Sequence, residues 1–462
     1  MKRRGFLRAG GLLGFGALMP RNASSVRDWP AHIEKIGIDG SAFDLKADPI
    51  EKVRIAIAGV GNRGTSLINM LEWLVDQGHA EITAICDVNP SKVDRALEQV
   101  AKFQQAVPRR FDSRPDAWQG ACTADSADLL LICTPWELHT EMSLYAMRSG
   151  LHAASEVPIA YTAEDCAELV LTSEKTKQHC IMLENCCYNE EELWLLNMIE
   201  EGIFGTLTHA ECAYLHDLRV MMLDPTYYED RWRLKHHLQR DGNLYTTHGL
   251  GPVCMYFDIL RGDTLTHLVS MSSQEASLSE AMAADADPAI QAMASDVRCG
   301  DVNTTLIKTA KGRSIMLQFD THSGRPYSRL DKLVGSKAAH YGYPSKLYID
   351  EGPSWSHSWL SDSDAAEYRD RYAHPLWTRL SEQVAQNRSG HGGMDFVMMY
   401  RLIRCLNLGE SLDLNIYDGA LWSMVGALSE QSVAGGNVRV DIPDLTAGRW
   451  REKRRHPVSR AL

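Results

Sequence analysis

Hydrophobic and polar residues follow two different patterns along this chain, and the change falls near residue 204. Before that point, short apolar runs alternate with stretches in which apolar positions recur every three or four residues, as on one face of a helix. The runs lie at 53–58, 81–87, 128–134, 152–156 and 180–184, and the helical stretches include 66–75, 137–150 and 163–177. This alternation predicts a doubly wound α/β domain of the Rossmann type, with a parallel sheet, over residues 50–203.

From residue 204 onward the apolar runs are longer and few helical stretches separate them. They lie at 207–215, 265–273, 303–310, 314–320 and 345–349. Consecutive strands predict an α+β second domain over residues 204–462, with a mostly antiparallel, open sheet. Residues 276–296 are rich in Ala, Ser and Asp and predict a mobile surface segment or an irregular helix. Helices at about 364–386 and 395–408 are expected to return to the first domain.

The first 25 residues differ from both domains. Lys2, Arg3 and Arg4 precede an uncharged stretch at 9–19 that is rich in Gly and Leu. A basic start before a short apolar run predicts a twin-arginine signal peptide over 1–25, the alternative being chance arginines on a frayed terminus. The apolar run is shorter than the ~20 residues that span a bilayer, so no membrane span is expected. This route exports proteins that have already folded in the cytoplasm. The protein could therefore bind its cofactor there before it reaches the periplasm or the medium.

Charge and composition narrow the possible partners. The formal net charge of -12 disfavours nucleic acid and anionic lipid. The 11 cysteines include no C-x-x-C pair, so buried free thiols are expected rather than a disulfide framework. The 17 histidines include no H-E-x-x-H, and the neighbours His236 and His237 point in different directions on any regular element. No metal site is therefore predicted.

A glycine-rich turn follows the first apolar run. Gly59, Gly61 and Gly64 have the G-x-G-x-x-G spacing between a predicted strand and a predicted helix, which is typical of a dinucleotide site. Such glycines let the backbone approach a pyrophosphate at the helix N-terminus. The second apolar run ends in Asp87, about 20 residues further on, where a carboxylate accepts ribose hydroxyls. Asp87 favours NAD over its 2′-phosphorylated form, although Arg63 beside the loop softens that preference.

These motifs, together with residues 133–139 (CTPWELH) and 155–158 (SEVP), resemble the glucose-fructose oxidoreductase and inositol dehydrogenase superfamily. Most members carry Glu-Lys-Pro at the last motif, where the lysine serves both cofactor and catalysis. This chain has Val157 at that position. The departure argues against a periplasmic NAD(P)-dependent sugar dehydrogenase or oxidoreductase, which is the alternative function. The superfamily also implies a homo-oligomer formed through an uncovered sheet face.

Longer segments resemble glycoside hydrolase family 109, the NAD-dependent α-N-acetylgalactosaminidases. They are residues 184–188, 210–219, 242–252, 300–305 and 325–329, in the same order. Asn189 and Thr246 depart from the family pattern, which has Gly and Pro there. The resemblance implies retaining hydrolysis of terminal α-linked N-acetylgalactosamine in a small molecule or a glycan. NAD takes hydride from C3, the C1 substituent is eliminated with the C2 proton, water adds, and the hydride returns.

Such a cycle needs a base near C2 and C3, and His248 is the first candidate. Tyr245 lies three residues earlier, so on one helical turn both face the same pocket. Tyr214 and His216 share one face of a predicted strand. By resemblance, Tyr214, Tyr245 and Tyr327 contact the sugar and His216 assists proton transfer. The alternatives are that the tyrosines only pack and that the histidine is a core residue. The pairing of Tyr245 with His248 argues against a third possible function, a sugar-binding protein without catalytic activity.

The resemblance also assigns residues to the cofactor and one arginine to the sugar. Arg233 is expected to reach the sugar, and a structural ion pair is the alternative for it. The residues assigned to NAD, besides the three glycines, are Asn62, Arg63, Asp87, Trp136, His139, Glu156, Val157, Asn185 and His248.

Overall fold

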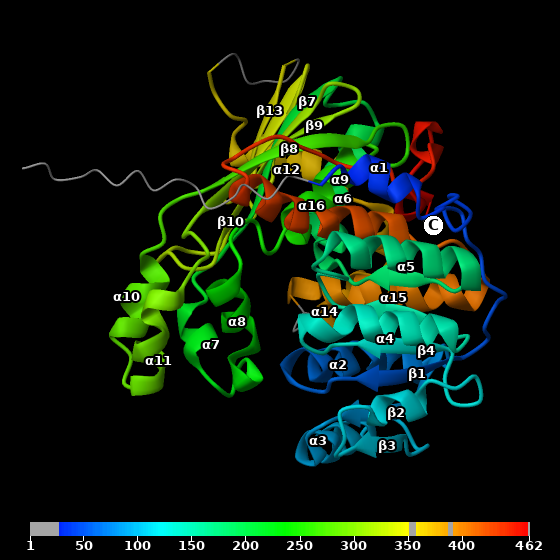
Figure 1. Cartoon of the computed structure of the whole chain (residues 1–462). Coiled ribbons are helices and arrows are strands. Elements are labelled where there is room, and N and C mark those ends of the chain that lie inside the picture. The colour runs from blue at the N-terminus through cyan, green and yellow to red at the C-terminus, as the bar shows by residue number, and fades with distance from the viewer. Residues whose placement is uncertain (1–26, 351–356, 387–390, 461–462) are drawn as a thin grey trace, which may run out of the picture.

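The computed structural model describes residues 27–350, 357–386 and 391–460. The predicted signal peptide at residues 1–25 lies outside the described residues. No helix within these ranges is both long enough and apolar enough to cross a membrane. Figure 1 shows two regions, each built around a sheet, with the blue and cyan region below the green and yellow one.

The first sheet has six parallel strands in the order β3-β2-β1-β4-β5-β6. The strands are β1 (Val53–Ala58), β2 (Ala80–Asp87), β3 (Arg109–Asp112), β4 (Leu129–Ile132), β5 (His152–Ser155) and β6 (Cys180–Met182). The helices that connect them are α2 (Asn62–Asp76), α3 (Pro90–Val100), η1 (Ala117–Ala121), α4 (Trp136–Arg148) and α5 (Ala163–Thr176). This strand order is that of the Rossmann fold and confirms the predicted class of the first sheet.

One strand of this sheet is absent from the sequence prediction. β3 lies at the edge of the sheet, beyond β2, and its residues Arg109 and Arg110 are exposed. Charged residues are common on edge strands, which lack the continuous apolar run that identifies a strand buried on both faces. The sheet therefore extends one strand beyond Asp87.

The second sheet has eight strands in the order β13-β12-β11-β7-β10-β9-β8-β14. They are β7 (Leu207–Leu215), β8 (Leu265–Ser272), β9 (Asn303–Thr309), β10 (Ser314–Asp320), β11 (Lys332–Gly335), β12 (Ala338–Tyr341), β13 (Lys346–Ile349) and β14 (Val440–Asp441). β7 and β10 pair in parallel and the other neighbours pair antiparallel. The mostly antiparallel class is confirmed, whereas the short strands β11, β12 and β14 were not predicted. The homo-oligomer stays a prediction.

Several helices lie before and between these strands. The α-helices are α1 (Trp29–Glu34), α6 (Glu190–Glu200), α7 (Arg219–Leu223), α8 (Trp232–Gln239) and α9 (Thr247–Tyr256). Two short 3-10 helices, η2 (Asn185–Tyr188) and η3 (Glu229–Arg231), lie among them. The segment 276–296 folds as α10 (Ser277–Ala283), α11 (Pro288–Met293) and η4 (Ala294–Asp296), which corresponds to the irregular helix among the two expected alternatives. Asp287 caps α11, and Pro288 occupies its first turn.

The C-terminal part differs in one respect from the expected pair of helices. The stretch 364–386 is not one helix but three, α12 (Asp362–Arg371), α13 (Pro375–Arg379) and α14 (Ser381–Gln386), because Pro375 cannot continue a helix from the preceding turn. After η5 (His391–Gly393), α15 (Met394–Leu408) packs against α2 and β1 of the first domain. The chain then ends with η6 (Arg449–Arg451) and η7 (Pro457–Arg460).

α16 (Ile416–Ala434) is a long helix that joins the two sheets. It contacts α5 and β6 on one side and β8 on the other, and Figure 1 shows it in orange between the two regions. Fourteen of its 19 residues are buried, and the other five lie in its C-terminal half, so most of the helix has no polar face toward water. A helix buried all round has no amphipathic period, and for that reason it was not predicted from the sequence.

Candidate active site

The carboxyl ends of the first sheet's strands face a cavity of about 1140 Å³ that residues of both domains line. The predicted site residues in its walls are Gly59, Gly61, Asn62, Arg63, Asp87, Trp136, His139, Glu156, Val157, Asn185, Tyr214, His216, Arg233, Tyr245 and His248. Gly64 and Tyr327 lie outside this lining. The fold thus gathers side chains from residues 59 to 248 around one space, at the edge where α/β sheets bind their ligands.

The glycine loop has the shape that a dinucleotide requires. Gly59 has φ +85°, and a Cβ on it would lie 2.7 Å from the Cys133 carbonyl oxygen. A Cβ on Gly64 would lie 2.0 Å from the Gly59 carbonyl oxygen, so this glycine lets α2 pack closely against β1. Gly61 stands at the N-terminus of α2 with nothing nearer its Cβ position than the Lys92 Nζ at 3.9 Å. The loop leaves room for a pyrophosphate at a helix N-terminus, and this geometry fits NAD.

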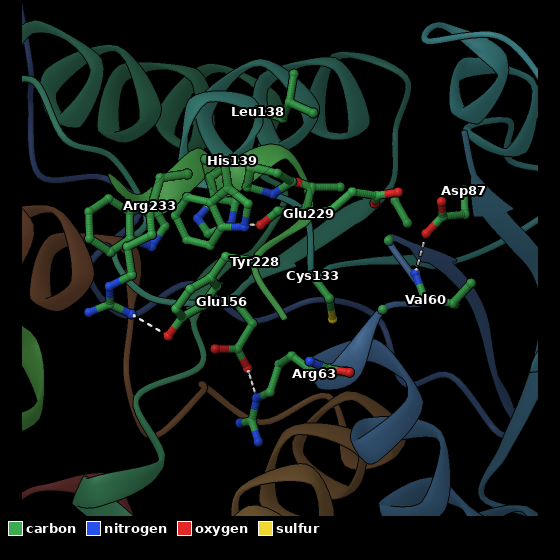
Figure 2. A pocket seen from close by; sticks show the side chains of 18 of the residues that line it. Val60, Arg63, Asp87, Cys133, Leu138, His139, Glu156, Tyr228, Glu229 and Arg233 are labelled. Carbon is green, nitrogen blue, oxygen red and sulfur yellow. Dashed lines mark hydrogen bonds and ion pairs between the residues drawn. The ribbon is translucent and has the colours of Figure 1, made fainter. Parts of the chain in front are cut away.

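Asp87 ends β2 beside this loop. Its Oδ2 accepts a hydrogen bond of 2.9 Å from the Val60 backbone N–H, and its Oδ1 accepts one of 2.9 Å from the Asn89 N–H. Figure 2 shows Asp87 joined to Val60 across the loop. Each carboxylate oxygen can accept more than one hydrogen bond, so Asp87 can hold the loop and still accept a ribose hydroxyl.

Arg63 is fully engaged by carboxylates of the protein. Its Nε donates to Glu156 Oε1 and its Nη1 to Asp395 Oδ2, both at 2.6 Å, and Figure 2 shows the first of these contacts. Asp395 also accepts from Asn185 Nδ2 at 2.6 Å. Burial raises the pKa of Asp395, but the hydrogen bond from His391 and the charge of Arg63 outweigh this and hold the pKa below its usual range. Arg63 is therefore a structural cation between two acids and is not turned toward Asp87.

Other predicted cofactor residues shape the walls of the cavity. His139 has both ring nitrogens on backbone carbonyls, Nδ1 at 2.7 Å from Pro158 O and Nε2 at 2.8 Å from Thr134 O. It therefore fixes the loops that follow β4 and β5. Trp136, the first residue of α4, and Val157 are both buried, so they present apolar surface to the cavity.

Arg233 is a buried cation that pairs with no acid in the described part of the chain. Its guanidinium carbon lies 5.0 to 6.0 Å from the ring centroids of Trp136, Tyr214, Tyr228 and Tyr245, and Nη1 donates to Tyr228 Oη at 3.2 Å. Within the described ranges, its Nε and Nη2 have no hydrogen-bond partner and no carboxylate pairs with the guanidinium. The alternative of a structural ion pair is therefore wrong. Because burying such a donor alone is costly, Arg233 is prepared to bind a polar ligand.

His248, which is partly buried, and Glu184, which is fully buried, form a dyad. His248 Nδ1 lies 2.7 Å from Glu184 Oε1, and Glu184 is 0% exposed. Burial alone raises the pKa of Glu184, but the His248 charge and hydrogen bond outweigh it, so the pKa is lowered. An ionised carboxylate only accepts hydrogen bonds, so His248 Nδ1 donates to Glu184, and Nε2 offers a lone pair when the imidazole is neutral. Nε2 lies 3.4 Å from Tyr245 Oη, as the three-residue spacing predicted, although Tyr245 precedes α9.

His216 and Tyr327 lie beside this dyad. The ring of His216 lies 6.1 Å from that of Tyr214 and 5.4 Å from that of Tyr327. Burial and the charge of Arg233 lower the pKa of His216, so its imidazole is neutral at pH 7, and its Nδ1 has no hydrogen-bond partner. Tyr327 is 36% exposed, and its Oη accepts from Arg329 Nη1 at 2.9 Å. It stands at the rim of the site rather than in the wall of the cavity.

A segment of the second domain, residues 224–231, reaches the glycine loop. Asn62 Nδ2 donates to the Tyr227 carbonyl oxygen at 3.3 Å, and Lys92 of α3 forms an ion pair with Glu229. Both contacts join the two domains next to the N-terminus of α2. The segment therefore covers the part of the cavity in which the glycines lie.

Three functional candidates were missed by sequence reasoning. Glu184 follows β6 as Asp87 ends β2, so an acid after a parallel strand was a signal that could have found it. Asp395 lies in the first turn of α15, where acidic residues are common because they interact favourably with the helix dipole. Its presence there gave no sign of a role in the site. Tyr228 lies in a polar loop and offers no signal.

The sheet order, the glycine loop and the cavity define an NAD-binding Rossmann-fold protein of the oxidoreductase type with a second, β-rich domain. Residues 53–184 match the model of the oxidoreductase family, NAD-binding Rossmann fold, and residues 188–452 match that of glycosyl hydrolase 109, C-terminal domain. The second match covers more than half of the chain. The chain therefore belongs to glycoside hydrolase family 109.

Relatives and solved structures agree with this assignment. The chain is 40% identical over 458 residues to the alpha-N-acetylgalactosaminidase of Shewanella oneidensis, which covers 97% of this chain and 96% of that protein. It is 40% identical over 457 residues, with the same coverage, to glycosyl hydrolase family 109 protein 1 of Shewanella sp. strain ANA-3. Levoglucosan dehydrogenase in complex with NADH and levoglucosan superposes with a TM-score of 0.62 at 16% identity, over 85% of this chain and 100% of that one. At such identity the likeness shows the fold alone.

Proposed function

We propose that this protein is an NAD-dependent glycosidase that releases terminal α-linked N-acetylgalactosamine with retention of configuration. One observation carries the proposal: the His248–Glu184 dyad, Tyr245 and the unpaired Arg233 share a single cavity with the glycine loop. A base and a sugar-binding cation thus lie beside a dinucleotide site. The alpha-N-acetylgalactosaminidase of Shewanella oneidensis, similar over nearly the whole chain, supports the choice of sugar.

The walls of the cavity suit an uncharged, polar sugar ring. Trp136, Tyr214 and Tyr245 offer aromatic faces for the C–H groups of the ring. The unsatisfied Nε and Nη2 of Arg233 supply donors for an acetamido carbonyl oxygen or a hydroxyl. A neutral substrate leaves Arg233 charged, and its hydrogen bonds would offset the cost of burying it.

NAD, held by the glycine loop and Asp87, would supply a reversible hydride acceptor that makes the proton on C2 of the sugar acidic. Because Glu184 engages Nδ1 of His248, the other ring nitrogen, Nε2, is placed to take that proton when the imidazole is neutral. Glu184 is a positioning residue that also stabilises the imidazolium that forms. Tyr245 Oη stands next to Nε2 and orients the sugar hydroxyl. His216, neutral at pH 7, can accept a proton from the incoming water.

The covering segment at residues 224–231 supports a cofactor that stays bound through the cycle. Its contacts with Asn62 and Lys92 lie next to the N-terminus of α2, beside the glycine loop that would hold the pyrophosphate. NAD is therefore expected to copurify with the folded protein, and extraction of the denatured protein tests this. Absence of nicotinamide in the extract, with no gain in thermal stability on adding NAD, would count against the proposal.

The decisive experiment is an assay of the purified protein with p-nitrophenyl α-N-acetylgalactosaminide, without added cofactor. We expect nitrophenol over many turnovers with no accumulation of free NADH. In deuterated water the released sugar should gain deuterium at C2, because elimination breaks that C–H bond whereas direct displacement at C1 does not. Net NADH formation from the free sugar would instead assign the protein to sugar dehydrogenases, and hydrolysis unaffected by removing NAD would overturn the mechanism.

We also propose that the chain is exported folded to the periplasm by the twin-arginine route. The basis is the sequence alone, with Arg3 and Arg4 before the apolar stretch 9–19. Replacing both arginines by lysine should retain the protein in the cytoplasm with full activity. Equal periplasmic yields of the two forms, measured by fractionation, would contradict this.

A further inference from the structure

A second cluster of ligating side chains lies outside the cavity. It consists of His237 on α8, Cys299 in the loop before β9, and His322 after β10. One ligating atom from each residue lies within 4.8 Å of those of the other two. All three residues are 0% exposed. Two imidazoles and a thiol from three separate segments therefore meet in the interior, away from the proposed reaction.

The hydrogen bonds inside this cluster do not satisfy its nitrogens. His322 Nε2 and His237 Nδ1 lie 2.8 Å apart, so the two rings share a single hydrogen bond. The other nitrogen of each ring, His237 Nε2 and His322 Nδ1, has no hydrogen-bond partner among the residues that the structure describes. Buried polar atoms are rarely left in this state, because each costs about 1 to 3 kcal/mol. A ligand that displaced the hydrogen bond between the rings would bind the two nitrogens that face each other, His237 Nδ1 and His322 Nε2.

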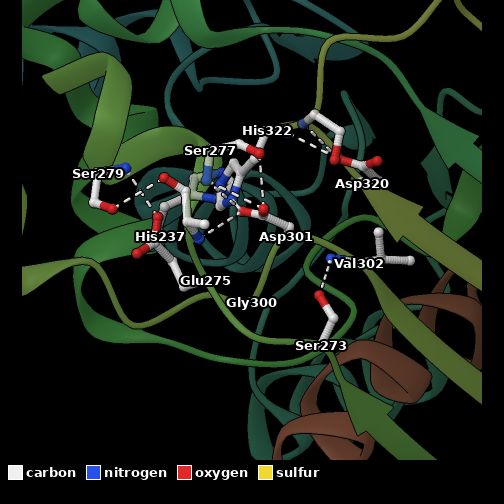
Figure 3. Close-up of polar contacts among 12 residues, drawn as sticks. His237, Ser273, Glu275, Ser277, Ser279, Gly300, Asp301, Val302, Asp320 and His322 are labelled. Atoms are coloured by element: carbon white, nitrogen blue, oxygen red, sulfur yellow. Dashed lines mark hydrogen bonds and ion pairs between the residues drawn. The ribbon is translucent and has the colours of Figure 1, made fainter. Parts of the chain in front are cut away.

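An acid is already arranged to orient one of the histidines. Asp301 Oδ1 lies 3.6 Å from His322 Nδ1. Asp301 is held in place by the Ser277 backbone N–H and hydroxyl, at 3.1 and 2.7 Å, and by the Ala276 N–H at 3.2 Å. Figure 3 shows Asp301 joined to Ser277 and His322 by these contacts. A carboxylate behind the far nitrogen of a histidine is the usual support of a metal ligand.

We propose that His237, Cys299 and His322 bind a zinc ion in the interior of this protein. A cysteine thiolate with two imidazoles is a ligand set that suits Zn²⁺, at about 2.3 Å to sulfur and 2.0 to 2.1 Å to nitrogen, with a fourth position for water. Binding replaces the hydrogen bond between the two rings and releases the thiol proton to solvent. The thiolate and the Asp301 carboxylate together neutralise the charge of the ion, which a fully buried site requires.

The place of the site in the fold indicates what the ion would do. It would tie α8 to the loop before β9 and to the segment after β10, which come from three separate parts of the second domain. α8 also carries Arg233, one turn before His237. The ion is therefore structural and fixes the helix that places Arg233, whereas the dyad of His248 and Glu184 does not touch it.

Metal analysis of the whole purified protein tests the proposal directly. After expression in zinc-supplemented medium and removal of loosely bound metal, we expect about one zinc per chain. Growth with cobalt in place of zinc should give the sulfur-to-cobalt charge-transfer absorption that a thiolate ligand produces. Less than about 0.1 transition metal per chain in a folded, NAD-binding protein, together with no cobalt absorption, would overturn the site.

Variants separate metal binding from burial. Cys299→Ser and His322→Asn should each lose at least about tenfold in bound zinc, and Cys299→Ser should also lose the cobalt absorption. His179→Asn is the matched control, because His179 is also buried with an unpartnered Nε2 but belongs to the first domain. It should keep its zinc. Equal zinc in Cys299→Ser and wild type would refute the site, and if a variant fails to fold, the wild-type metal content and cobalt spectrum still decide.

Discussion

The two halves of the cavity are built in different ways. The half that faces the first sheet is made from backbone shape and from charges that are already paired: a glycine loop, Asp87 on two backbone N–H groups, and Arg63 between two acids. The half that faces the second sheet is made from side chains and contains a buried charge, Arg233, that pairs with no acid among the described residues. The first half is complete without the sugar. The second half is completed only when a polar ligand binds Arg233. Such a difference suits a cavity that keeps its cofactor while substrate enters and product leaves.

The largest effect is expected where the two halves meet. His248→Ala should lower kcat by about 10²-fold to 10⁴-fold, the usual share of general acid–base catalysis, while NAD stays bound. The assay is hydrolysis of the nitrophenyl substrate combined with deuterium uptake at C2, and both should fall together. Near-normal turnover in this variant would move the base to His216 or Tyr214.

Arg233→Met should separate the sugar half from the cofactor half. We expect kcat/KM to fall by about 10-fold to 100-fold, because charge-assisted hydrogen bonds are worth about 1.5 to 3 kcal/mol, with unchanged NAD affinity. Thermal stability should stay level or rise, because a buried, unpaired cation is removed. Arg240→Met is the control, since that arginine is paired with Glu430 and its loss should instead lower the melting temperature. A large drop in the stability of Arg233→Met would show that the arginine is structural.

Asp87→Ala should weaken the cofactor half alone. The expected loss in NAD affinity is about 1 to 3 kcal/mol, because a charge-assisted hydrogen bond to the ribose and the support of the Val60 N–H disappear together. Titration of NAD into protein freed of its cofactor measures the change. Unchanged affinity would remove Asp87 from the ribose site.

Gly64→Ala tests whether the shape of the backbone, rather than any side chain, defines this half. A Cβ 2.0 Å from the Gly59 carbonyl oxygen must push α2 away from β1. A cost of about 1 to 3 kcal/mol is expected, in thermal stability or in NAD affinity. Gly78→Ala, where nothing lies within 4 Å of the added atom, is a control for the loss of a glycine, although its φ of +75° adds strain of its own. A Gly64 variant as stable and as NAD-loaded as wild type would contradict the close packing.

The smallest effect is expected from pH. Glu184 and Asp395 have folded-state pKa values below their unfolded values, so the stability they contribute is present above the unfolded pKa and is lost as pH falls through the folded pKa. Urea unfolding from pH 7 down to pH 3 should therefore show a falling midpoint. Glu184→Gln should flatten part of that fall, and an equally steep profile in the variant would show that the dyad does not contribute.

Sequence reasoning recovered the elements whose signal is local. The first domain could be predicted because its central strands are continuous apolar runs. The glycine loop could be predicted because its conformation depends on a few neighbouring residues. The edge strand β3 and the largely buried helix α16 were missed, because the first has charged, exposed residues and most of the second is surrounded by protein. Both patterns hide the periodicity on which such predictions depend.

The sequence by itself determined the family and the Rossmann class of the first sheet, and of the residues it predicted for the site all but Gly64 and Tyr327 line the cavity. Only the tertiary structure decided which charges are paired. Glu184 meets His248 across 64 residues, Arg63 meets Asp395 across 332, and Arg233 meets no acid within the described ranges. The cluster of His237, Cys299 and His322 was equally invisible, because its members come from a helix and two loops with no common spacing. Whether two charges pair depends on the distance between them in space. In a folded chain of this length, the number of residues between two charges does not reveal that distance.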